Sequence, residues 1–224
     1  MIKFAIFDLD GTLLDSSEMW RTLGKRYLEY IGKTPEAGLS DKLNEMTMLE
    51  SARYLRRTYD IPYSSEEILR HITRMTEKYY MEEVRLKDGA SKLLAALHSH
   101  CVHMSIATAG NERLGMSALM RLGVSDFFEG AVSCSDYGSK VTPDVFFAAA
   151  ELIYALPEET IVFEDSLFAV RTAKSAGFVT AAVKDISEKE QETLKETADF
   201  YAENIGDFAD NIKEILRFKR ESNE

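Results

Sequence analysis

The chain has 224 residues, 45% of them hydrophobic, and a formal net charge of −11 at pH 7. This composition predicts a packed core in one ample domain, or in a domain with a sizeable insertion, and excludes a largely disordered chain. So acidic a chain lacks the basic surface that nucleic acids and anionic membranes attract, and we expect neither as a partner.

The first predicted element is a buried strand over the apolar residues 2–7. Two carboxylates one residue apart follow it, Asp8 and Asp10, and Gly11 allows the backbone to turn away at once. Open α/β sheets bind their ligands at the carboxyl ends of parallel strands. Two acids this close repel each other unless a cation or a shared proton lies between them. Because Mg²⁺ prefers oxygen ligands, the pair favours a magnesium site.

Residues 15–86 follow a helical pattern without a convincing strand. Three helices are expected there: one opened by a capping box of Asp15 and Glu18 and ended by Gly32, one over residues 40–58, and one capped by Ser64 and Glu67. Together they indicate a small helical bundle.

After Gly89 the pattern changes to alternating helices and strands. The expected strands cover residues 102–107, 130–133, 160–163 and 178–183, and the expected helices cover residues 111–122, 142–154 and 166–176. Two further helices are expected to close the chain. Such alternation requires a parallel sheet with helices on both faces.

The first strand must join this sheet, because it is too apolar to stand alone. We therefore expect an α/β fold: a Rossmann-like, three-layer parallel sheet core formed by residues 1–14 and 87–224. Residues 15–86 are expected to form an inserted, all-helical cap domain.

Polar residues stand at three further strand ends. Thr108, Ala109 and Gly110 follow the second core strand, where a hydroxyl, small residues and a helix start make a phosphate cradle, although Thr108 could instead cap the helix. Lys140 precedes the helix start Thr142-Pro143-Asp144-Val145-Phe146, a position where a lone lysine is usually solvated. Glu164 and Asp165 end another buried strand, where an acidic pair has few structural reasons to exist.

Taken together, these segments resemble the four motifs of the haloacid dehalogenase superfamily, in the same order and with roughly the same spacing. The segments are Asp8-Leu9-Asp10-Gly11-Thr12, the Thr108 strand end, Lys140 with the helix start after it, and Glu164-Asp165. The chain is most similar to the branch of β-phosphoglucomutases and phosphoglycolate phosphatases, which carries a helical cap between the first two motifs. This resemblance implies a magnesium-dependent phosphatase that acts on a small phosphorylated metabolite through an aspartyl-phosphate intermediate.

The resemblance also implies a role for each motif residue. Asp8 would be the nucleophile, and Asp10 would protonate the leaving alcohol and then activate water. The transferring phosphoryl group would be held by Thr108, Ala109, Gly110 and Lys140. Mg²⁺ would be bound by Asp8, the Asp10 carbonyl and Asp165, with Glu164 acting directly or through water.

Two alternatives remain open. One is a β-phosphoglucomutase-like sugar-phosphate isomerase, but the cap histidine and arginine of those relatives have no counterpart in Glu18-Met19-Trp20 or Thr47-Met48-Leu49. The other is a non-catalytic binding protein on the same fold, although no motif residue is lost.

The two cysteines, Cys101 and Cys134, have no Cys/His cluster around them and are expected to be reduced thiols. No charged leader precedes the first apolar run, and no stretch reaches the length of a membrane span. We therefore expect a cytoplasmic protein without membrane contact, as a monomer or weak dimer.

Overall fold

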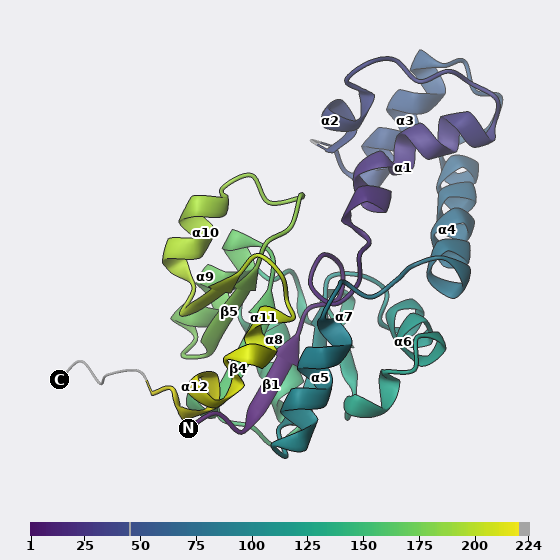
Figure 1. Ribbon diagram of the computed structural model, residues 1–224. Coiled ribbons are helices and arrows are strands. Elements are labelled where there is room, and N and C mark those ends of the chain that lie inside the picture. Colours follow the sequence, from purple (N-terminus) through teal and green to yellow (C-terminus); the bar gives the residue numbers. More distant parts are fainter. Residues whose placement is uncertain (45, 220–224) are drawn as a thin grey trace. The chain divides into compact units, whose positions relative to one another are not determined.

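The computed structural model describes residues 1–44 and 46–219 (Figure 1). The chain forms two compact units, one of Met1–Asp15 with Val84–Glu224 and one of Ser16–Glu83. No helix within the described residues is long and apolar enough to cross a membrane.

The first unit contains, within the described residues, a six-stranded sheet in the order β3-β2-β1-β4-β5-β6. The strands are β1 (Phe4–Phe7), β2 (His103–Thr108), β3 (Ala131–Ser133), β4 (Thr160–Glu164), β5 (Val179–Val183) and β6 (Phe200–Ala202). Every pairing is parallel, and β1 lies between β2 and β4 with Phe7 level with Ile106 and Phe163. Strands β4 and β5 are buried throughout, as expected for a parallel sheet covered on both faces.

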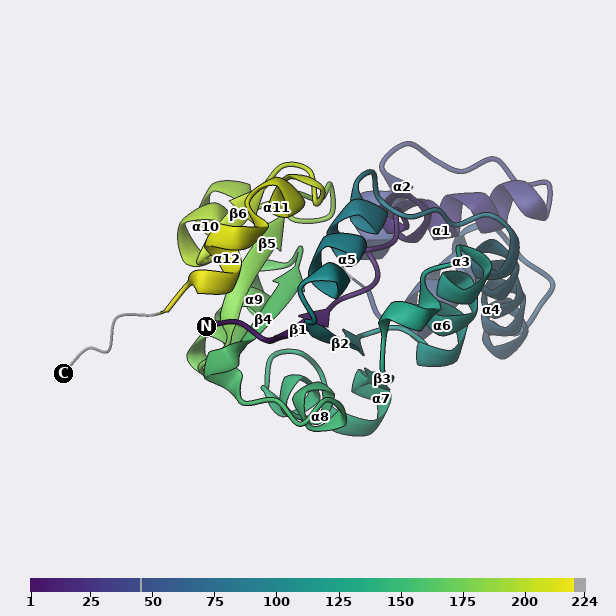
Figure 2. The same ribbon diagram turned by 60° about the horizontal axis from the view of Figure 1, so that its bottom comes forward.

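Helices cover both faces of this sheet. They are α5 (Ala90–Ser99), α6 (Glu112–Arg121), α7 (Cys134–Tyr137), α8 (Asp144–Leu152), α9 (Leu167–Ser175), α10 (Gln191–Thr197), α11 (Asp207–Asp210) and α12 (Ile212–Arg217). Figure 2 shows α8 on one side of the sheet and α5, α11 and α12 on the other. Apolar residues of α8 and α9, such as Phe146 and Ala173, form one core cluster with Ile6 and Val162 of the sheet. The expected α/β three-layer fold is therefore confirmed.

The end of the chain differs from the expectation of two closing helices. The described residues contain α10, α11 and α12, together with the short strand β6, which pairs with β5 between Phe200 and Ala181. A three-residue edge strand is too short to produce a readable alternation of apolar and polar residues, so its pairing depends on the neighbouring strand.

The second unit consists, within the described residues, of α1 (Ser17–Tyr30), α2 (Leu39–Asn44), α3 (Met48–Thr58) and α4 (Ser65–Glu82). The expected capping box of Ser64 and Glu67 is confirmed at the start of α4. The expected box of Asp15 and Glu18 is wrong, because Ser16 is the N-cap of α1 and Glu18 pairs with Arg21.

The single helix expected over residues 40–58 is also wrong. The helix α2 ends at Asn44, and α3 begins after Thr47. The Thr47 hydroxyl accepts from Glu50 N at 3.3 Å, while Glu50 accepts from Thr47 N at 2.8 Å. This capping box starts a new helix inside a stretch whose apolar spacing looks continuous.

Candidate active site

Three neighbouring strands deliver the sequence-predicted polar residues to one edge of the sheet. Asp8 follows β1, Thr108 ends β2, and Glu164 ends β4 with Asp165 directly after it. Because β1 lies between β2 and β4, the parallel sheet brings these residues together from distant parts of the chain.

Lys140 reaches the same edge from the segment between α7 and α8. Its side chain is only 3% exposed, and its ammonium donates to Asp8 Oδ1 and, at 2.5 Å, to Glu164 Oε1. Lys140 is therefore buried, unlike most lysines that stand just before a helix. A buried lysine between two carboxylates holds a fixed positive charge at this edge of the sheet.

A buried acidic cluster surrounds this lysine. Asp8, Glu164 and Asp165 each offer a carboxylate oxygen, and these atoms lie within 4.8 Å of one another. With all groups ionised, three carboxylates face one ammonium, which leaves a net charge of −2 in a buried place. A divalent cation would neutralise that charge.

The acid–base properties of the cluster point the same way. Burial raises the pKa of Asp8 to about 7, although Lys140 opposes the shift. Burial also raises the pKa of Asp165, and the charges of Glu164 and Asp8 add to that shift. Burial lowers the pKa of Lys140, but its two carboxylate partners outweigh burial and raise that pKa overall. The ionised carboxylates thus need more positive charge than Lys140 supplies.

The hydrogen-bond partners of the cluster show which oxygens fit a metal ion. Asp8 Oδ2 is a buried oxygen without a hydrogen-bond partner in the described part of the chain. Glu164, in contrast, uses both oxygens: Oε1 accepts from Lys140, and Oε2 accepts from Asp165 N at 2.9 Å and from Ser166 N at 3.1 Å. An orphaned oxygen on Asp8, with Asp165 beside it, fits Mg²⁺ as a hard oxygen-binding ion.

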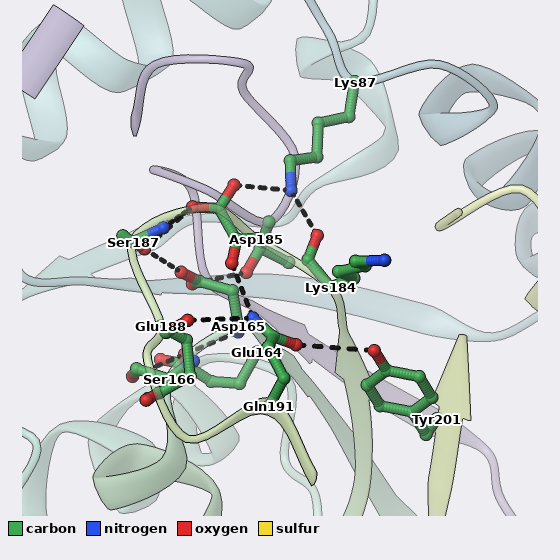
Figure 3. A network of polar contacts seen from close by, with 11 residues as sticks. Lys87, Glu164, Asp165, Ser166, Lys184, Asp185, Ser187, Glu188, Gln191 and Tyr201 are labelled. Carbon is green, nitrogen blue, oxygen red and sulfur yellow. Dashed lines mark hydrogen bonds and ion pairs between the residues drawn. The ribbon is translucent and has the colours of Figure 1, made fainter. Parts of the chain in front are cut away.

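Asp165 is held from two sides. Its Oδ1 accepts from the Thr12 hydroxyl at 3.1 Å. Its Oδ2 accepts from the Ser187 hydroxyl at 3.2 Å (Figure 3). Thr12 lies in the first motif, but Ser187 lies in the loop after β5, where the sequence carries no motif to indicate it.

The segment after β2 forms a turn that Thr108 closes, and Thr108 does not cap α6. The Thr108 hydroxyl accepts from Gly110 N at 2.9 Å, whereas Asn111 caps α6 by accepting from Leu114 N at 3.1 Å. The capping interpretation of Thr108 is therefore wrong. Ala109 and Gly110 also line a cavity of about 670 Å³ within the first unit.

Asp10 lies beside Gly110 of this turn and not in the acidic cluster. A Cβ on Gly110 would lie 3.0 Å from Asp10 Oδ2. The glycine therefore allows the segment after β2 to approach the segment after β1 closely. Among the described residues, the group of metal-competent carboxylates does not include Asp10. That separation suits a carboxyl group whose expected task is proton transfer.

Comparison with known proteins identifies relatives along nearly the whole chain. The family described as haloacid dehalogenase-like hydrolase matches residues 5–183. A glyceraldehyde 3-phosphate phosphatase of Pyrococcus furiosus is 31% identical over 201 residues, which cover 82% of this chain and 81% of the relative. A Drosophila melanogaster protein named "Probable pseudouridine-5'-phosphatase" is 29% identical over 218 residues, which cover 92% of this chain and 94% of the relative.

Solved structures show the same fold. A Thermotoga maritima protein assigned as a beta-phosphoglucomutase overlays with a TM-score of 0.84 at 24% identity, over 96% of this chain and 100% of that one.

Proposed function

The chain belongs to the haloacid dehalogenase-like hydrolases, and its similar relatives are named as phosphatases. We propose that it is a Mg²⁺-dependent phosphatase of a small phosphorylated metabolite. The observation that carries the proposal is the buried contact of Lys140 with Asp8 and Glu164, beside Asp165. This arrangement supports charge neutralisation and positioning, which phosphoryl transfer chiefly requires.

In the proposed reaction, a carboxylate oxygen of Asp8 attacks phosphorus and the bond to the alcohol oxygen breaks. Asp10 gives a proton to the leaving alcohol. Water then attacks the phosphorus of the aspartyl phosphate while Asp10 takes a proton back, which releases phosphate and restores the Asp8 carboxylate.

The other residues hold charge and geometry. Lys140 and the Thr108 hydroxyl would bind the phosphoryl oxygens, with Ala109 and Gly110 beside them. Mg²⁺ held by Asp8, Asp165 and the Asp10 carbonyl would supply Lewis-acid neutralisation of those oxygens.

We assign Glu164 a positioning role. Its Oε1 accepts from Lys140 and its Oε2 from the backbone N–H groups that open α9, so the Glu164 carboxylate holds both in place beside the metal site. The second unit is proposed as the cap domain that the sequence predicts over residues 15–86.

A panel of phosphorylated metabolites tests the function. The purified protein with Mg²⁺ is offered pseudouridine 5'-phosphate, glyceraldehyde 3-phosphate and a range of sugar and polyol phosphates, and released phosphate is measured. Hydrolysis of at least one compound by the wild type, and none by Asp8→Asn, is expected. Isomerisation of a sugar phosphate without phosphate release would favour the mutase alternative, and no turnover on a broad panel would favour a binding protein.

A further inference from the structure

A chain of polar contacts runs from Lys87 to the acidic cluster (Figure 3). The Lys87 ammonium lies 2.7 Å from Asp185 Oδ2 and donates to Lys184 O at 2.9 Å. Asp185 Oδ1 accepts from Ser187 N at 2.9 Å, and the Ser187 hydroxyl lies 2.7 Å from Asp185 Oδ1 and 3.2 Å from Asp165 Oδ2. All of these residues belong to the first unit.

The Lys87–Asp185 ion pair, at the end of this series of polar contacts, is well protected from solvent. The side chains of Lys87 and Asp185 are 15% and 4% exposed, whereas the neighbouring pair of Lys184 and Glu203 is 50% and 74% exposed. A buried ion pair with additional hydrogen bonds has a defined geometry, in contrast to a mobile surface pair.

The Ser187 hydroxyl lies between two carboxylates, at 2.7 Å from Asp185 Oδ1 and 3.2 Å from Asp165 Oδ2. The hydroxyl has one proton and can donate to only one of the two carboxylates at a time. Asp185 already receives the Lys87 ammonium and the Ser187 backbone N–H. Because Asp185 keeps these two donors without the hydroxyl, the hydroxyl can give its proton to Asp165 Oδ2, while Asp165 Oδ1 is held separately by Thr12.

We propose that Ser187, whose loop is anchored by the Lys87–Asp185 pair, is a positioning residue that orients the Asp165 carboxylate for Mg²⁺. This inference rests on the proposed function, because it concerns the same metal site. Partners of metal-binding carboxylates fix the ligand's orientation, and losing one typically weakens metal binding about 10- to 100-fold. The segment around Lys87 also donates Lys87 N to Leu13 O at 2.8 Å, so the loop after β5 is tied to the backbone that follows the first motif.

The test measures Mg²⁺ binding to the full-length protein by calorimetry, without substrate. Ser187→Ala is expected to raise the dissociation constant for Mg²⁺ about 10-fold. Ser187→Thr, which keeps the hydroxyl, should bind Mg²⁺ nearly as the wild type does. Ser99→Ala is the matched control, because the Ser99 hydroxyl donates to Ala96 O at 2.7 Å and lies 3.2 Å from His100 Nδ1, ahead of the start of β2 and so at the opposite edge of the sheet.

A second variant tests the anchor. Asp185→Asn should also weaken Mg²⁺ binding several-fold, whereas Glu203→Gln, which removes an exposed carboxylate from the neighbouring pair, should not. Circular dichroism melting confirms that each variant is folded.

The outcomes separate the two proposals. If the wild type binds Mg²⁺ and Ser187→Ala and Asp185→Asn both bind it within twofold of the wild type, the positioning role is overturned and the phosphatase proposal stands. If the wild type does not bind Mg²⁺, both the metal-dependent function and the positioning role are overturned.

Discussion

At the scale of the residue, Lys140 shows how burial defines a side chain's task. Its ammonium lies between Asp8 and Glu164 with almost no exposure to water. Solvent cannot replace the charge of the ammonium in that place, so the stability of the acidic cluster depends on the Lys140 nitrogen.

Replacing Lys140 by Met should destabilise the protein by about 3–5 kcal/mol, because the buried carboxylates lose their compensating charge. Lys92→Met is the control: Lys92 forms an exposed ion pair with Asp210, and its loss should cost less than about 1 kcal/mol. Urea unfolding of both variants measures the difference. Equal stability of the two variants would contradict the buried role of Lys140.

Asp8→Asn should lower phosphatase turnover by about 10⁴-fold or more, because an amide is a poor nucleophile. The melting temperature should not fall, since the amide removes one charge from a crowded acidic cluster. Steady-state phosphate release and thermal melting measure the two effects. Turnover within about tenfold of the wild type would rule out Asp8 as the nucleophile.

At the scale of the element, capping decides where helices in the second unit begin. Thr47 and Glu50 exchange hydrogen bonds at the start of α3, and Ser64 and Glu67 do the same at the start of α4. At the start of α1, the Ser16 side chain forms no such cap, and Asp15 N instead donates to Arg85 O at 2.9 Å within the first unit.

Thr47→Ala should destabilise the second unit by about 1 kcal/mol, because Glu50 N loses its side-chain acceptor. Thr47→Ser keeps the oxygen and should retain most of the stability. Urea denaturation followed by circular dichroism compares the two. A destabilisation by Ser as large as that by Ala would show that the effect does not come from the cap.

At the scale of the whole molecule, the balance of charge in the acidic cluster predicts dependence on a divalent metal. EDTA should abolish activity and added Mg²⁺ should restore it, because Asp8, Glu164 and Asp165 carry more negative charge than Lys140 compensates. Mg²⁺ at 100 times its dissociation constant should also stabilise the fold by about 2.7 kcal/mol. Calorimetric melting with and without Mg²⁺ measures this effect. Full turnover in EDTA, with no shift in melting, would exclude a metal-dependent mechanism.

The sequence by itself determined the α/β class, the core strands and the residues at their carboxyl ends. These features depend on local patterns, since a buried strand needs a continuous apolar run and a turn after it needs residues such as Gly11. Asp8, Thr108 and Asp165 could be read as neighbours because parallel strands align their carboxyl ends at one edge.

Only the tertiary structure decided which of these groups bond to one another and which atoms remain without a partner. Lys140 reaches Asp8 across 132 positions of sequence, and Ser187 reaches Asp165 from a loop that carries no motif. The strand β6 likewise depends on the edge of β5. Such contacts depend on the path of the loops and on the burial of charged groups away from water. The local spacing of apolar residues encodes neither of these.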